Sequence, residues 1–161
     1  MILARVTAIV LAWFLLSAQT GDDGFADTLD EAFGKDTLII SADRHACWLF
    51  DIYVASTRSQ QMRGLMHVRE LPDFTGMIFI YRRADIRSMW MRNTYIPLDM
   101  LFIDAGGKIV HIVERTVPQS LTTISAGRPV RAVLEVNAGT VRRLQIRTGD
   151  RVVHPLFGNA G

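Results

Sequence analysis

Cys47-Trp-Leu-Phe-Asp-Ile-Tyr-Val-Ala55 is the stretch that decides the fold class. Within it Trp48, Phe50, Ile52 and Val54 recur at period two, the spacing of a β-strand with one buried face. The apolar run Leu38-Ile39-Ile40 predicts another strand just before it, so we expect the folded domain to begin near Thr37. The stretch therefore predicts a domain built mainly from strands.

A short helix is predicted directly after this strand. Thr57-Arg-Ser-Gln60 has the spacing of a capping box, in which the Thr and Gln side chains each bind the other's backbone N–H. Behind it Met62, Leu65 and Met66 lie at offsets of three and four, which places them on one helical face. We expect one helix from Thr57 to about Met66.

Turn residues divide the rest of the chain into more short strands. Apolar runs predict strands at 77–81, 89–91, 98–103 and 130–136, and Asp104-Ala-Gly-Gly107 predicts a hairpin turn into a returning strand over 108–114. We expect a loop over 117–128, one or two helical turns over 140–146 and a last strand over 151–154. The fold class is therefore mainly β (α+β): a compact, β-barrel-like single domain over 37–157 with one or two short helices.

The N-terminus has a composition of its own. A chain of 161 residues with 49% apolar and 21% charged residues is typical of one globular domain and excludes disordered and polytopic membrane proteins. Residues 6–16, however, carry no charge, follow Arg5 and precede a small, polar run, which predicts a signal peptide over 1–26. We expect a periplasmic or otherwise exported protein. The alternative is an uncleaved helix that anchors the chain in the inner membrane, facing the periplasm.

Cysteine and histidine usage argues against a metal site. Cys47 is the single cysteine, so no internal disulfide can form, and we expect its thiol to be buried and inert. His45 and Cys47 would share a strand face, and six methionines follow the first residue, which suggests a soft ion such as copper(I). No spacing matches a structural zinc site and most methionines belong to apolar runs, so we predict no metal and no cofactor.

Arginines also cluster in the sequence. Runs at 82–87 and 142–151 would suit a nucleic acid, but such runs more often form solvated faces. An exported protein is in a different compartment from the chromosome. We therefore predict no nucleic-acid partner.

Several short motifs recur in an order that matches a known family. They are Gly64-Leu65-Met66, Gly76-Met77-Ile78-Phe79, Trp90-Met91-Arg92-Asn93-Thr94, Ile96-Pro97-Leu98-Asp99, Phe102-Ile103-Asp104, Leu134-Glu135, Gly139 and Gly149-Asp150. Over roughly Leu49 to Val153 the chain resembles the domain of unknown function 192 family. The resemblance implies an exported or cell-envelope protein with a small β-rich domain, and it implies no reaction. One departure is Gln60-Gln61-Met62-Arg63, where the family commonly carries a Glu-Arg or Gln-Arg pair, and it argues against a role for a helix carboxylate.

The polar residues beside these apolar motifs form the candidate binding site: Arg63, Trp90, Arg92, Asn93, Asp99, Glu135 and Asp150. A charged side chain next to buried strands must be paired or solvated. One interpretation is a polar pocket at the mouth of the barrel, in which arginines hold an anionic group and carboxylates accept hydrogen bonds. The other is a structural network of buried salt bridges and side-chain caps on turns.

No recognisable catalytic motif accompanies these residues, so we expect a non-enzymatic module that binds a small molecule, a glycan or an envelope protein. The alternative is a hydrolase or lyase on a cell-wall or sugar substrate, with Asp99 and Glu135 or Asp150 as its acid/base pair. Two carboxyl groups that face one cleft about 5–10 Å apart would favour the enzyme. Carboxylates bound by arginines or turns would favour binding or structure.

Overall fold

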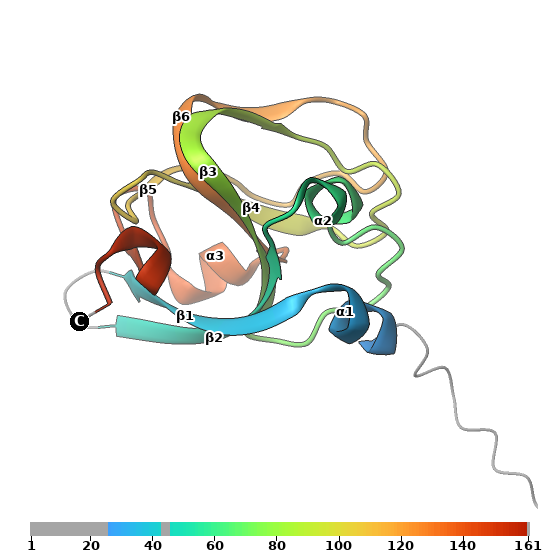
Figure 1. The fold of residues 1–161 in the computed structure, drawn as a ribbon, viewed down its shortest axis with the longest axis horizontal. Coiled ribbons are helices and arrows are strands. Elements are labelled where there is room, and N and C mark those ends of the chain that lie inside the picture. The colour runs from blue at the N-terminus through green and yellow to red at the C-terminus, as the bar shows by residue number, and fades with distance from the viewer. Residues whose placement is uncertain (1–25, 43–45, 161) are drawn as a thin grey trace, which may run out of the picture.

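Seven strands form one sheet in the order β5-β4-β6-β3-β2-β1-β7. The computed structural model describes residues 26–42 and 46–160. The strands are β1 (Gly34–Ala42), β2 (Ala46–Ala55), β3 (Thr75–Met89), β4 (Leu98–Ile103), β5 (Ile109–Val113), β6 (Ile124–Asn137) and β7 (Arg151–Val153). The sheet curls into half of a barrel (Figure 1), which confirms the prediction of a mainly β, barrel-like single domain.

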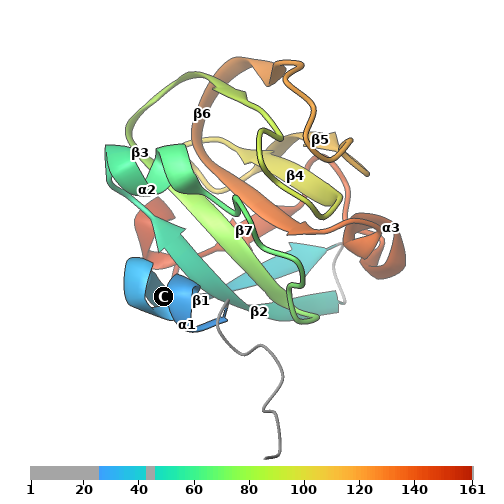
Figure 2. The same ribbon diagram turned by 90° about the vertical axis from the view of Figure 1, so that its right-hand side faces the viewer.

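Three short helices pack against the curled sheet: α1 (Ala26–Ala32), α2 (Arg58–Arg63) and α3 (Thr140–Leu144), with a final 3₁₀ turn at Pro155–Phe157. β2 and β3 are parallel, and the crossover between them contains α2. The other strand pairs are antiparallel. The crossover places α2 beside the outer part of β3, residues 85–89 (Figure 2).

The core occupies both faces of the sheet. One cluster includes Phe50, Leu101 and the α3 residue Val141. The other includes Phe79, Phe102 and residues next to α1 and α2. Neighbouring residues of a strand point to opposite faces of the sheet, and both faces are covered by the core. β4 is therefore buried at every position, from Leu98 to Ile103.

Local contacts confirm the two turn motifs. Gln60 N donates to Thr57 Oγ1 (3.2 Å) and Thr57 N donates to Gln60 Oε1 (3.1 Å), which completes the capping box at the start of α2. In the β4–β5 hairpin, Asp104 Oδ1 accepts from the backbone N–H groups of Gly106 and Lys108, both at 2.9 Å. Gly107 has φ +82°, and a Cβ there would lie 2.5 Å from the Val152 carbonyl oxygen, so the turn requires glycine.

The structure corrects several predicted boundaries. α2 ends at Arg63 rather than near Met66, so Leu65 and Met66 follow the helix instead of lying on its face. β6 already begins at Ile124, inside the predicted loop over 117–128, and of the predicted strand at 89–91 only Met89 belongs to a strand. The outer part of β3 pairs with residues 124–130 as a two-stranded ribbon (Figure 2). Most of its residues are exposed, so it shows no period-two apolar pattern from which the sequence could predict it.

The predicted burial of Cys47 is wrong, because its thiol is exposed. Trp48, Phe50 and Ile52 point into the core, so the alternation of a strand turns Cys47 outward. The predicted signal peptide or anchor, apart from Ala26, lies outside the described residues, as does His45. Within the described ranges, no helix is long and apolar enough to cross a membrane.

Candidate functional site

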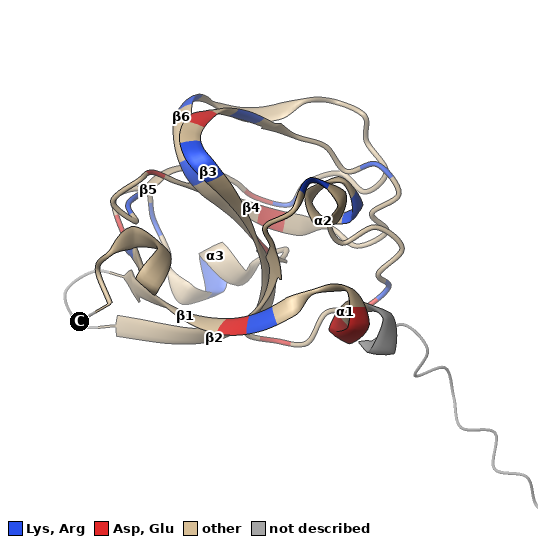
Figure 3. Ribbon diagram, viewed as in Figure 1, with Lys and Arg blue, Asp and Glu red and all other residues tan. Residues whose placement is uncertain are grey.

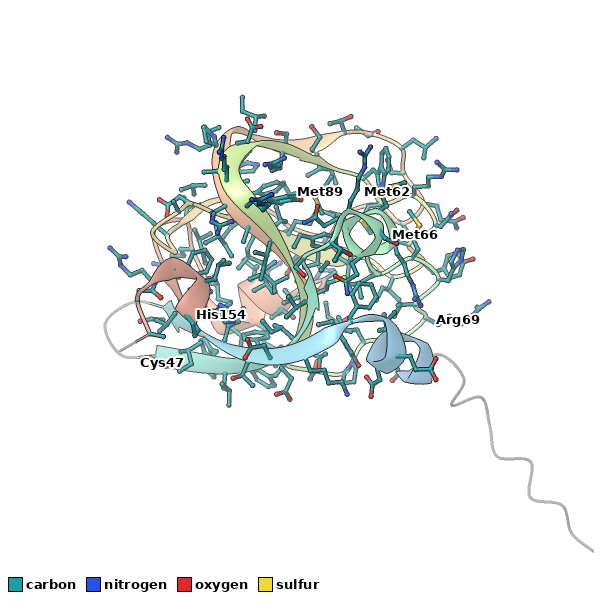
Figure 4. The ribbon with its side chains drawn as sticks, in the orientation of Figure 1. Cys47, Met62, Met66, Arg69, Met89 and His154 are labelled. Carbon is teal, nitrogen blue, oxygen red and sulfur yellow. The ribbon has the colours of Figure 1, made fainter. Side chains whose placement is uncertain are left out.

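A cavity of about 510 Å³ opens between α2, the outer part of β3 and the segment 90–94. This volume suits a small organic ligand. In Figure 4, Met62, Met66 and Met89 lie near α2, and the three side chains form part of the cavity wall. The lining residues are Arg58, Gln61, Met62, Arg63, Gly64, Leu65, Met66, Phe79, Tyr81, Ile86, Arg87, Ser88, Met89, Trp90, Arg92, Thr94, Thr123 and Glu135.

Glu135 lies at the floor of this cavity and is only 4% exposed. In β6 it stands opposite Met77 of β3 and Met100 of β4, so its carboxyl group emerges from an apolar surface. Among the described residues, nothing forms a hydrogen bond or ion pair with that carboxyl group. Burial raises the pKa of Glu135 to about 8. The group is therefore protonated at neutral pH and offers an O–H donor to the cavity.

Tyr81 lies close to Glu135 on the wall formed by β3. Its hydroxyl donates to Met89 Sδ (3.4 Å), and the Arg87 guanidinium lies over its ring, 4.3 Å from the centroid. Burial raises the pKa of Tyr81 to about 12, with a smaller opposing effect of the Arg87 charge and a smaller raising effect of Glu135. The Tyr81 hydroxyl thus stays protonated and holds Met89, while the Tyr81 ring packs against Arg87.

The rim of the cavity is cationic and partly apolar. Arg58, Arg63 and Arg92 are exposed and Arg87 is half-buried, so four guanidinium groups surround one neutral carboxyl group. Figure 3 shows the basic residues on α2 and on β3. Three large apolar side chains stand among them, Met62, Ile86 and Trp90, each at least half exposed. A rim of this kind attracts negative charge.

Four of the seven predicted site residues line the cavity: Arg63, Trp90, Arg92 and Glu135. Asn93 lies beside it, with its amide nitrogen 4.0 Å from Met66 Sδ and a left-handed backbone at φ +55°. Asp99 and Asp150 lie outside it. The structure thus brings together residues from α2, the segment 90–94 and β6, but not the predicted carboxylates of β4 and the turn before β7.

Asp99 holds the backbone instead. It is fully buried, and its two oxygens accept from the N–H groups of Arg115, Gly139 and Val141, each at 2.9 Å. It thereby binds N–H groups at the start of α3, where Gly139 has no side chain to do so. Asp150 Oδ2 accepts from Arg147 N (2.7 Å) in the turn before β7. Both contacts match the interpretation of side-chain caps.

Sequence reasoning missed Tyr81, Arg87, Met89 and the α2 residue Met62 as parts of the site. The period-two continuation from Phe79 to Tyr81 was a signal for Tyr81. No local pattern showed that α2 would stand beside the ribbon. In the described part of the chain, no group of three His, Cys, Asp or Glu side chains is arranged to hold a metal ion.

Comparisons with known proteins agree with this fold. The family model of domain of unknown function 192, described as "Uncharacterized ACR", matches residues 39–154. A crystal structure from Sinorhizobium meliloti 1021, described as that of a candidate transcription regulator, is 38% identical over 77% of this chain and 96% of its own, with a TM-score of 0.76. A protein of unknown function from Novosphingobium aromaticivorans DSM 12444 is 36% identical over 74% and 85%, with a TM-score of 0.71. No curated protein is significantly similar.

Proposed function

The chain belongs to the domain of unknown function 192 family of uncharacterised proteins, and we propose that it is a cell-envelope module that binds a small molecule without catalysis. The observation that carries the proposal is the partnerless carboxyl group of Glu135 in a cavity of ligand size. The carboxyl group opens to the cavity, and no group of the described residues binds it, so it can form a hydrogen bond with a ligand there. A bound small molecule would supply that partner.

The alternative, a carboxylate acid/base enzyme, needs two carboxyl groups that face one cleft. Among the described residues that line the cavity, Glu135 is the only acid. The other two candidates, Asp99 and Asp150, already accept hydrogen bonds from backbone N–H groups. This arrangement supports binding over acid/base hydrolysis.

The proposed location rests on the N-terminal sequence. A basic residue, Arg5, precedes the uncharged residues 6–16, and a small, polar run follows, in the order of a signal peptide. The ligand would accordingly be a molecule that reaches the cell envelope.

A second candidate follows from the description of the S. meliloti protein as a candidate transcription regulator. Arg82, Arg83 and Arg128 are exposed on the β3–β6 ribbon, and paired strands bind nucleic acid in some regulators. Binding to duplex DNA that weakens steeply with salt would support this candidate. Export of the chain would argue against it.

Native mass spectrometry of the protein recovered from its host envelope tests the leading proposal. We expect an added mass that is lost on denaturation, on a chain shortened by the predicted signal peptide. Ser88→Trp narrows the cavity from its exposed wall and should abolish the added mass. Ser59→Trp, on an exposed α2 position outside the lining, is the matched control and should keep it. A bare protein, or equal added mass in both variants, would contradict the proposal.

A further inference from the structure

We propose that the cavity selects an amphipathic organic anion, whose apolar body lies on the floor while its anionic group lies at the arginine rim. This inference rests on the proposed function, since it names the ligand class of the same cavity. It follows from three properties of the lining: a largely apolar floor, the neutral carboxyl donor of Glu135 within it, and a rim with excess positive charge.

The floor is apolar and adaptable. Leu65 and Phe79 are buried there and belong to the second core cluster, while Met66 and Met89 are half-buried beside them. Methionine side chains are flexible and polarizable, so they can pack against apolar groups of different shapes. An apolar ligand body placed here would leave water and gain about 25 cal/mol for each Å² that it buries.

Glu135 adds one directional contact to this floor. Its protonated carboxyl group can donate to a neutral oxygen of the ligand, such as a carbonyl or hydroxyl. It would not favour a second negative charge in the same place, because an ionised ligand group loses its hydration on an apolar floor. The anionic group of the ligand therefore belongs at the rim.

The rim, in contrast to the floor, favours a negatively charged group. Arg58, Arg63 and Arg92 are exposed around the mouth, and no ionised acid lines the cavity in the described part of the chain. Guanidinium groups bind carboxylates and phosphates through paired N–H donors. Met62, Ile86 and Trp90 also line the cavity and are exposed, so the mouth offers apolar contact to the part of the ligand next to its charge.

This combination excludes three simpler ligands. An inorganic anion would bind the rim but leave the floor without a partner. An organic cation would be repelled by four arginines. A polyhydroxylated sugar needs many hydrogen bonds, whereas the buried part of the lining offers few polar groups, Glu135 and Thr94, among apolar side chains.

Methyl NMR of the full chain tests the ligand class with four probes: octanoate, octylammonium, n-octanol and inorganic phosphate. The methyl groups of Met62, Met66 and Met89 line the cavity, whereas those of Ile109 and Val141 lie in the other core cluster, and their signals serve as internal controls. We expect octanoate, below its micelle concentration, to shift the lining signals at the lowest concentration. Octanol should bind more weakly, octylammonium more weakly still, and phosphate should leave the floor signals of Met66 and Met89 unmoved.

Charge variants test the rim. Arg58→Gln and Arg92→Gln should each weaken octanoate binding roughly two- to fivefold, and the double variant about tenfold. Arg142→Gln, an exposed arginine of α3 outside the cavity lining, is the matched control and should leave it unchanged. Octanol affinity should not respond to any of the three substitutions.

The outcomes separate the two proposals. If none of the probes shifts a lining methionine, the binding function itself is contradicted. If octanol or octylammonium binds as tightly as octanoate, or if phosphate competes with octanoate at equal concentration, small-molecule binding stands and the anionic, amphipathic ligand is overturned.

Discussion

Replacing Glu135 by Gln tests whether this chain keeps a buried acid at a cost to its own stability. The substitution preserves size and a hydrogen-bond donor but removes the ionisable group. Burial raises the pKa of Glu135 from 4.5 to about 8, so the folded state holds its proton in a pH range where the unfolded chain has released it.

The sign and size of the effect follow from this pKa. Below pH 4.5 the group is neutral in both states, and the free energy of unfolding carries no penalty. As pH rises from 4.5 to about 8, the free energy of unfolding falls by up to ~1.4 kcal/mol per pH unit, and it levels off above the folded-state pKa. Between pH 5 and 7.5 this loss is about 3 kcal/mol. The stability advantage of Glu135→Gln over the wild type should therefore be about 3 kcal/mol larger at pH 7.5 than at pH 5.

Urea unfolding followed by circular dichroism at both pH values measures this difference. Glu70→Gln, at an exposed position, is the control and should change stability equally at the two pH values. A stability gain of Glu135→Gln that is the same at pH 5 and pH 7.5 would refute the buried, neutral carboxyl group.

Three further predictions concern the framework. Asp99→Asn should lower the free energy of unfolding by about 3 kcal/mol, because an amide cannot accept hydrogen bonds at both of the positions that the two carboxylate oxygens occupy. Asp104→Asn is the control and should cost under ~1 kcal/mol, because a single oxygen of Asp104 accepts both hydrogen bonds. Urea titration measures both variants, and an Asp99→Asn variant as stable as the wild type would contradict the capping role of Asp99. Cys47 should react completely with a thiol reagent in native buffer, and protection until unfolding would contradict its exposure. Gln60→Ala should cost about 1 kcal/mol in thermal unfolding through loss of the capping box, and no change would show that the box is dispensable.

Structural elements that are determined by residues close in sequence could be predicted from the sequence. The period-two run in β2 depends only on which side chains of one strand face the core. The capping box of α2 and the β4–β5 turn depend on hydrogen bonds within a few residues. In each case the residues that determine the structure are neighbours along the chain. The same alternation, applied one residue earlier than Trp48, would also have turned Cys47 outward.

The roles of the acidic residues depend on long-range contacts. Asp99 and Glu135 follow similar apolar patterns in the sequence, and both are buried. Asp99 meets backbone N–H groups around 115 and 139–141, which lie far along the chain. Glu135 meets no such groups and faces a cavity. Sequence spacing alone could not separate a cap from a site residue.

The sequence by itself thus determined the inner parts of the strands, the start of the short helix, the hairpin and the family. Only the tertiary structure decided where the cavity lies, because its walls come from α2, from β3 with the segment 90–94, and from β6. The parallel crossover from β2 to β3 brings α2 over the ribbon, and the pairing of β6 between β3 and β4 places Glu135 beneath it. Such an arrangement arises from the packing of the whole sheet, whereas periodicity and capping report only on residues that are close in sequence.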